Sequence, residues 1–309
     1  MNKTHPLFNL IIIACIAFGS LIVAQFIALG VAVLFYGVEL GDLQRLISNP
    51  QKDFPNIKQI YWIVQGGSLL LGMGGGAFLY QKWVAKQNFS ELNLNNQMSF
   101  VGIGLALLIF MLAIPISSEM MRWNNSLDFG SFDKQIRDLE GQAKVIVDLI
   151  TQMDNFGEML IVLFVIAVIP AFVEEYLFRG LVQNEFLRWL KNPHIVVWLT
   201  AAIFSAVHFQ FLGFFPRLFL GVLLGYLYVW SGNIIYPMIG HFCNNGLQVL
   251  ILYLYQRSII GEELTKEDYP VPLPMLVAAT LLLLLVLWYA KKTYLSGKTE
   301  NKTNPVLVE

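Results

Sequence analysis

The sequence has little charge and almost no cysteine. Only 13% of its 309 residues are charged, against roughly a quarter in ordinary soluble domains. The formal net charge is −1, so no basic field favours nucleic acid, and we expect no nucleic-acid partner. The two cysteines, Cys15 and Cys243, lie in apolar runs without C-x-x-C spacing. That spacing excludes a disulfide framework and a thiolate zinc site.

In place of charge, the sequence has long apolar segments. It is 56% hydrophobic, with a mean hydropathy of +0.61. A helix needs about 20 apolar residues to cross a hydrocarbon core of about 30 Å. Backbone amides in lipid must pair within their own segment, and no stretch resembles the alternating strands of a barrel. The sequence therefore predicts an all-α, polytopic membrane protein, a bundle of about eight transmembrane helices. The expected segments are residues 7–36, 59–80, 99–117, 158–180, 194–210, 216–230, 233–255 and 273–290.

The loops suggest an orientation and a division of the chain. Basic residues stand directly beside helix ends on one side, while the other side has longer loops rich in acids, which predicts that both termini are cytoplasmic. We expect three parts. Residues 1–157 hold the first three helices and an outer connector, residues 158–255 hold four core helices, and residues 256–309 hold the last helix and a cytoplasmic tail. The basic residues are Lys3, Lys82, Lys86, Arg188, Lys191, Lys291, Lys292, Lys298 and Lys302.

The connector at residues 118–157 is the one long hydrophilic stretch. Ile136, Leu139, Ala143 and Ile146 recur at near-helical spacing with charges between them. This pattern predicts an amphipathic helix that lies on the outer surface or packs on the bundle. A simple helical connector is the favoured interpretation, and a cap that gates substrate entry is the alternative.

Ionisable side chains inside the spanning segments are grouped rather than scattered. Each costs roughly 2.5–3.5 kcal/mol on insertion scales, so each calls for a reason. They fall on three segments. The fourth carries Glu174, Glu175 and Arg179, the fifth carries His208, and the seventh carries His241 and Asn245.

Their spacing within each helix predicts which side chains share a face. Glu175 and Arg179 are four residues apart, with the acid first, so they can neutralise each other. Glu174 is rotated by about 100° and has no cation on its own face. A second carboxylate at low dielectric holds a proton more readily and is suited to taking one from water. His241 and Asn245, again four apart, should face the same neighbour.

The depth of these polar side chains in the membrane predicts that they meet. At about 1.5 Å of rise per residue, His208, His241 and Asn245 can reach the same level near mid-membrane. Glu174 joins them if the fourth helix continues past Gly180 toward Leu190. We therefore expect one water-accessible cavity, with the Glu174 carboxylate within about 8 Å of at least one of the two histidines.

Glu-Glu-x-x-x-Arg, Phe-x-x-x-His and His-x-x-x-Asn follow one another on three hydrophobic segments. This order resembles the CPBP family, the CAAX-protease and bacteriocin-processing membrane peptidases also called the Abi family. The resemblance covers roughly residues 158–250, and the preceding helices fit the family's eight-helix plan. It implies an intramembrane endopeptidase of the bacterial cytoplasmic membrane that hydrolyses a membrane-associated peptide or protein, lipidated or signal-like.

The resemblance also implies a role for each motif residue. Glu174 with His208 would polarise a water, and His241 with Asn245 would donate hydrogen bonds to the developing oxyanion. Glu175 and Arg179 would hold the fourth helix and set the charge state of Glu174.

A metal and other functions stay as alternatives. Glu174, His208 and His241 suffice in number for a catalytic zinc, but no His-Glu-x-x-His is present, and a metal-free reaction is favoured. A non-catalytic immunity or partner-binding protein could keep the same fold and motifs. A proton-coupled transporter would also bury carboxylates and histidines, but no second copy of the motifs indicates repeated halves.

Overall fold

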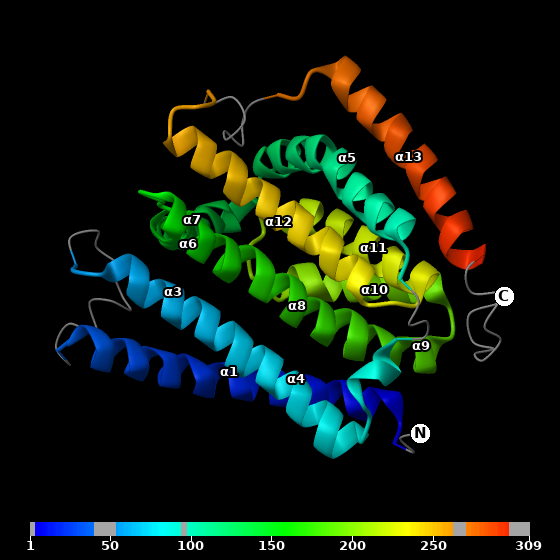
Figure 1. Cartoon of the computed structure of the whole chain (residues 1–309), viewed down its shortest axis with the longest axis horizontal. Helices are drawn as coiled ribbons and strands as arrows, with labels where there is room; N and C mark the ends of the chain where they lie inside the picture. The colour runs from blue at the N-terminus through cyan, green and yellow to red at the C-terminus, as the bar shows by residue number, and fades with distance from the viewer. Residues whose placement is uncertain (1–3, 40–53, 94–97, 262–269, 297–309) are drawn as a thin grey trace.

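The computed structural model describes residues 4–39, 54–93, 98–261 and 270–296, and within these ranges every regular element is helical. The predicted all-α class is therefore confirmed. Each of the eight expected segments lies on a helix or on a continuous run of helices, and most of these lie side by side in Figure 1. The first three are α1 (Pro6–Tyr36), the run from α3 through η2 (Ile57–Ala85), and α5 (Phe100–Asn125).

The remaining segments follow the same order along the chain. The fourth is the run from α7 through α9 (Phe156–Leu190), called here the fourth helix. It comprises α7 (Phe156–Leu163), η5 (Phe164–Val168), α8 (Ile169–Glu175), η6 (Tyr176–Gln183) and α9 (Asn184–Leu190). After it come α10 (Pro193–Ala206), α11 (Phe214–Ser231), α12 (Ile235–Gln256) and α13 (Leu273–Ser296).

Six of these eight are long and apolar enough to cross a membrane. α10 has only 14 residues, about 21 Å of helix at 1.5 Å per residue, which is short for a core of about 30 Å. α12 is 22 residues long but carries His241 and two asparagines, which lower its hydropathy. The two exceptions therefore lie among the helices that carry the polar motifs.

Several predicted ends differ from the observed ones. The fourth helix does not end at residue 180 but continues to Leu190, because η6 carries the chain through Gly180 without a break. The fifth segment ends at Ala206, earlier than expected, since the chain turns sharply and Phe209 adopts a positive φ of 53°. α13 extends to Ser296, so the expected tail begins later, and residues 297–309 lie outside the described residues.

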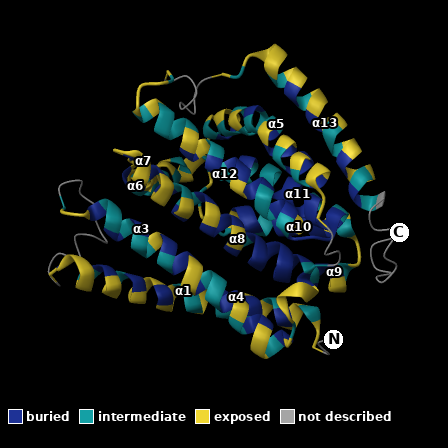
Figure 2. Cartoon of the chain, in the orientation of Figure 1, coloured by how far each residue is buried: buried dark blue, intermediate teal, exposed yellow. Residues whose placement is uncertain are grey.

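Burial separates central helices from peripheral ones. In the most apolar window of each helix, 44% of residues are buried in the fourth helix and 56% in α11, against 17% in α1 and α13. Figure 2 shows the same contrast, with dark blue gathered on α8 and α11 and yellow along α1 and α13. The fourth helix and α11 thus form the protein core, while α1 and α13 leave apolar side chains free to contact lipid.

The predicted amphipathic helix is α6 (Asp133–Ile150), and it packs on the bundle at one end. Leu149 and Ile150 are buried against α3, and Trp62 donates a hydrogen bond to the Ile150 carbonyl at 2.7 Å. Leu139, nearer the start of α6, is 57% exposed. The helix is therefore buried at its C-terminal end, while in its more exposed first half Glu140 accepts a hydrogen bond from the Leu212 amide in the loop between α10 and α11.

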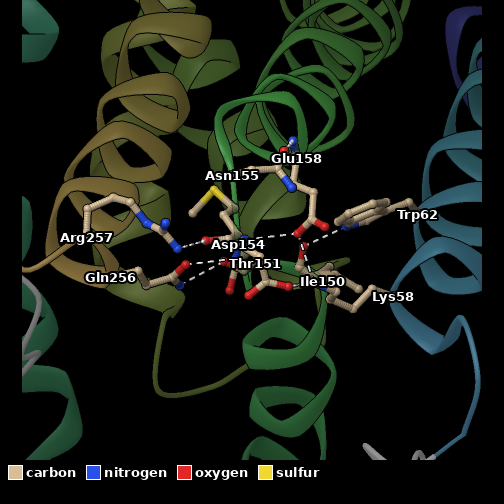
Figure 3. Close-up of polar contacts among 10 residues, drawn as sticks. Lys58, Trp62, Ile150, Thr151, Asp154, Asn155, Glu158, Gln256 and Arg257 are labelled. Atoms are coloured by element: carbon tan, nitrogen blue, oxygen red, sulfur yellow. Dashed lines mark hydrogen bonds and ion pairs between the residues drawn. The ribbon is translucent and has the colours of Figure 1, made fainter.

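The turn after α6 is tied to two other helices, as Figure 3 shows. Lys58 of α3 contacts Asp154 at 2.6 Å and Glu158 at 2.8 Å. Gln256, the last residue of α12, accepts from the Met153 amide at 2.8 Å, and Arg257, directly after α12, donates to the Met153 carbonyl at 3.2 Å. These contacts fix one end of the fourth helix between α3 and α12.

Candidate active site

The centre of the site is an ion pair on the fourth helix. Arg179 Nη1 lies 2.7 Å from Glu175 Oε1, and both side chains are fully buried. The second terminal nitrogen of Arg179 donates to the Gly221 carbonyl of α11 at 3.0 Å, and its guanidinium lies 4.9 Å from the centre of the Phe204 ring. The i,i+4 pair expected from the sequence is present, and it also joins the fourth helix to α10 and α11.

His241 of α12 extends this pair toward Glu174. Its Nδ1 lies 2.8 Å from Glu175 Oε1. A carboxylate paired with arginine accepts hydrogen bonds, so Nδ1 is the donor. The other ring nitrogen, Nε2, lies 3.9 Å from Glu174 Oε2. A row of polar groups therefore runs from Arg179 through Glu175 and His241 to Glu174. The distance from Glu174 to His241 is well below the limit of about 8 Å expected between the Glu174 carboxylate and a histidine.

Glu174 is the accessible end of this chain. Its side chain is 13% exposed, whereas that of Glu175 is completely buried. Because the gap of 3.9 Å to His241 Nε2 is too long for a direct hydrogen bond, the two groups are not committed to each other. A water or a substrate oxygen lying beside that gap can contact both.

His208 lies just beyond α10 rather than on it. Its Nδ1 is 2.7 Å from the Phe204 carbonyl. A carbonyl only accepts, so Nδ1 donates, and Nε2 of the neutral ring is left as an acceptor. His208 is within electrostatic range of Glu174 and His241. The Phe204 ring packs edge-on against both histidines, with centroids 5.1 and 6.2 Å away, and thereby spaces them.

Asn245 contacts the backbone of the fourth helix instead of its carboxylates. Its amide nitrogen donates to the Ile166 carbonyl at 3.0 Å. Pro170 has no N–H, so the Ile166 carbonyl lacks its i+4 helical donor, and Asn245 supplies one. The side-chain amide of Asn244 in turn donates to the side-chain oxygen of Asn245, Oδ1, at 3.0 Å. Both His241 and Asn245 thus face the fourth helix as predicted, but at different levels of it.

Arg217 is a residue of this site that the motif analysis did not identify. It lies in the first turn of α11, within electrostatic range of Glu174 and His208. Glu174 therefore has a nearby cation, although on another helix. The signal was in the sequence, since an arginine inside an expected spanning segment calls for the same explanation as the acids and histidines.

A catalytic metal ion would need about three grouped ligands, and among the described residues no three His, Cys, Asp or Glu side chains are grouped so as to hold one. Nδ1 of His241 donates to Glu175, and Nδ1 of His208 donates to the Phe204 carbonyl. Nε2 of each ring is left as the nitrogen that could bind a metal, so these two bonds are compatible with either mechanism. No step is assigned to a metal, and metal independence stays a prediction.

These features define a class: an all-helical membrane protein with a buried acid–histidine site assembled from the fourth helix, α11, α12 and the loop after α10. Residues 156–247 match the family described as type II CAAX prenyl endopeptidase Rce1-like. The resemblance inferred from the three motifs is confirmed for this part of the chain.

Two curated relatives are similar to the chain. The membrane-embedded CAAX protease MroQ of Staphylococcus aureus (strain USA300) is 32% identical over 105 residues, 32% of this chain and 42% of MroQ. The uncharacterized protein YpbD of Bacillus subtilis (strain 168) is 40% identical over 76 residues, 23% of this chain and 35% of YpbD. The chain thus aligns with less than half the length of either relative. No solved structure matches the chain significantly.

Proposed function

We propose that the chain is an intramembrane endopeptidase in which Glu174 activates a water molecule. The observation that carries this proposal is the 3.9 Å gap between Glu174 Oε2 and His241 Nε2, at the end of a buried chain through Glu175 to Arg179. Buried ionisable groups in a membrane protein are costly, and a reaction that uses them gives a reason for the cost.

In the proposed first step, a water near Glu174 gives one proton to its carboxylate as the oxygen attacks the scissile carbonyl carbon. His208 Nε2, left free by the bond from Nδ1 to the Phe204 carbonyl, accepts the second hydrogen of that water and orients it. The carbon–oxygen bond forms, and the carbonyl oxygen becomes an oxyanion.

His241 is the proposed donor to this oxyanion. Because its Nδ1 donates to Glu175, a donating Nε2 means an imidazolium, and the carboxylates of Glu174 and Glu175 flank that positive charge. Glu174, now protonated, returns its proton to the leaving amine as the carbon–nitrogen bond breaks. The products are a carboxylic acid and an amine, and Glu174 is again a carboxylate.

Asn245 is proposed first as the residue that holds α12 on the fourth helix, through the Ile166 carbonyl. An amide group has two N–H bonds, so Asn245 retains one for the oxyanion role that the family resemblance implies. Glu175 and Arg179 orient His241 and keep the charges of the site balanced.

The substrate proposed is a peptide or protein in or at the membrane, lipidated or signal-like. MroQ is described as a membrane-embedded CAAX protease, which supports this class for a similar chain. We further propose that the protein resides in the bacterial cytoplasmic membrane with both termini inside. Basic residues such as Lys82, Lys86 and Arg188 lie near the helix ends that would face the cytoplasm in this orientation.

The test compares purified wild-type protein with Glu174→Gln and Arg122→Gln variants in lipid nanodiscs. Candidates for the substrate come from comparative proteomics of membranes with and without a working Glu174. We expect cleavage by wild-type and Arg122→Gln protein and none by Glu174→Gln, which keeps the size of the side chain but loses the base. Equal cleavage by Glu174→Gln, or no cleavage by wild type, would favour a non-catalytic partner-binding or immunity protein.

A further inference from the structure

The loop that carries His208 has an unusual backbone. Residues 207–213, called here the His208 loop, join α10 to α11. Phe209, directly after the histidine, has a φ of +53°, a left-handed conformation that aromatic side chains rarely adopt. Contacts with the rest of the protein must therefore hold this conformation.

Two neighbouring helices hold the far end of the loop. The buried Asn124 of α5 donates to the Phe211 carbonyl and accepts from the Phe215 amide, each at 3.1 Å. Glu140 of α6 accepts from the Leu212 amide at 2.9 Å. Neither of these contacts reaches the residues next to His208.

Arg217 holds the near end. Its two terminal nitrogens donate to Gln210, one to the side-chain Oε1 and one to the main-chain carbonyl, both at 2.6 Å. A Cβ added to Gly213 would lie 2.7 Å from Arg217 Nη2, so the guanidinium packs directly on the loop backbone. Gln210 is only two residues from His208, and a fork of two bonds fixes it in orientation as well as in distance.

The position of Arg217 is electrostatically costly. It is a cation in the first turn of α11, where the helix dipole disfavours positive charge, and it lies within a spanning segment. Its Nε is buried without a hydrogen-bond partner among the described residues. The carboxylates of Glu140 and Glu174, which are both within electrostatic range of Arg217, attract its positive charge and offset part of this cost.

We infer that Arg217 is a positioning residue of the proposed peptidase: it holds the His208 loop through Gln210 and balances the charge of Glu174 from α11. This inference rests on the proposed function and extends it, since none of the motif residues forms a hydrogen bond with Gln210 of the His208 loop among the described residues. Arg217 acts through Gln210 and Glu174 rather than on the substrate, so its loss should lower kcat and leave KM nearly unchanged.

The experiment uses the full chain in nanodiscs and four proteins: wild type, Arg217→Lys, Arg217→Gln and the control Arg122→Gln. Arg122 is an exposed arginine of α5 whose side chain pairs with Glu119. We expect a kcat loss of about 10²-fold in Arg217→Gln, the size of effect that small misplacements produce. Arg217→Lys keeps the charge and should recover part of the loss, and Arg122→Gln should match wild type.

Amide hydrogen exchange of residues 207–213 supplies a readout that does not depend on turnover. Exchange should be faster in Arg217→Gln than in wild type and unchanged in Arg122→Gln. Unchanged exchange in Arg217→Gln overturns the inference, whether or not the wild type cleaves a peptide. Faster exchange with a wild-type kcat overturns it as well. No cleavage by any of the proteins overturns the proposed function. In that case, faster exchange of residues 207–213 in Arg217→Gln still supports the conclusion that Arg217 holds the loop, and unchanged exchange still overturns it.

Discussion

Glu175 Oε1 lies 2.8 Å from His241 Nδ1 and 2.7 Å from Arg179 Nη1, so one buried carboxylate oxygen binds both a histidine and an arginine. This single atom links α12 to the fourth helix. It also requires that Nδ1 of His241 carries a proton, and it leaves Nε2 directed at Glu174. The second motif glutamate is thus the orienting group, and Glu174 is left for the chemistry.

Arg179 is predicted to be essential for stability. Replacing it by Ala leaves Glu175 buried without its arginine, and loss of one partner of a buried pair typically costs about 3–5 kcal/mol. Folded yield and the thermal unfolding temperature should fall together with activity. Arg122→Ala, at an exposed pair, is the control and should change the unfolding temperature little. An Arg179→Ala protein of normal stability without turnover would instead move Arg179 into the catalytic group.

Glu174→Gln and Glu175→Gln should differ in kind. Glu174 is partly exposed and has no direct hydrogen bond to another described residue, so its amide variant should fold normally and lose activity. Glu175→Gln removes the charge that binds Arg179 and His241, so it should lose both stability and activity. Thermal unfolding and cleavage assays on the same preparations compare the two. A pair of variants with equal unfolding temperatures would contradict the separation of roles.

Asn245→Ala is predicted to weaken the contact between α12 and the fourth helix. It leaves the Ile166 carbonyl without the donor that compensates for Pro170, a loss of about 1–3 kcal/mol. Asn245 is also proposed to donate to the oxyanion, so kcat of the folded variant should fall by about 10²–10³-fold, the usual cost of losing such a donor. A kcat close to that of wild type, together with the loss of stability, would leave Asn245 with the structural role alone and would contradict its oxyanion role.

Hydrolysis is predicted to need no tightly bound metal. Prolonged chelation should leave cleavage intact, and elemental analysis of active protein should find well under one metal per chain. The motivation is that Glu174, which is partly exposed, can take the water proton, and that His241 can supply the oxyanion donor without a metal. Should activity disappear on chelation and return with stoichiometric zinc, Glu174, His208 and His241 become the candidate ligands and the proposed mechanism is wrong.

The Lys58–Asp154 contact predicts a small dependence of stability on pH. The hydrogen bond from Lys58 holds the pKa of Asp154 below its ordinary range. A carboxyl group with a lowered pKa stabilises the fold above its ordinary pKa, about pH 4, and loses that contribution as pH falls further. Asp154 is exposed, so the contribution should be at most about 1 kcal/mol. Asp154→Asn should therefore unfold at a slightly lower temperature than wild type at pH 7, and the difference should shrink as pH falls below about 4.

Hydrophobic length and helical spacing determined the helices and the short-range polar pairs of this protein. The eight segments follow from apolar runs, and the Glu175–Arg179 contact follows from a separation of four residues on one helix. These are local properties, so the sequence alone specifies them.

Tertiary structure decided how the segments meet. η5 and η6 are π-helical segments on either side of α8. They change the directions in which the side chains of the fourth helix point, by amounts that a period of 3.6 residues per turn does not predict. That rotation brings Glu175, rather than Glu174, against His241 Nδ1. The end of α10 at Ala206 places His208 on a loop, and the packing of α11 brings Arg217 to it. Each contact depends on crossing angles between separate helices, which no spacing within one segment encodes.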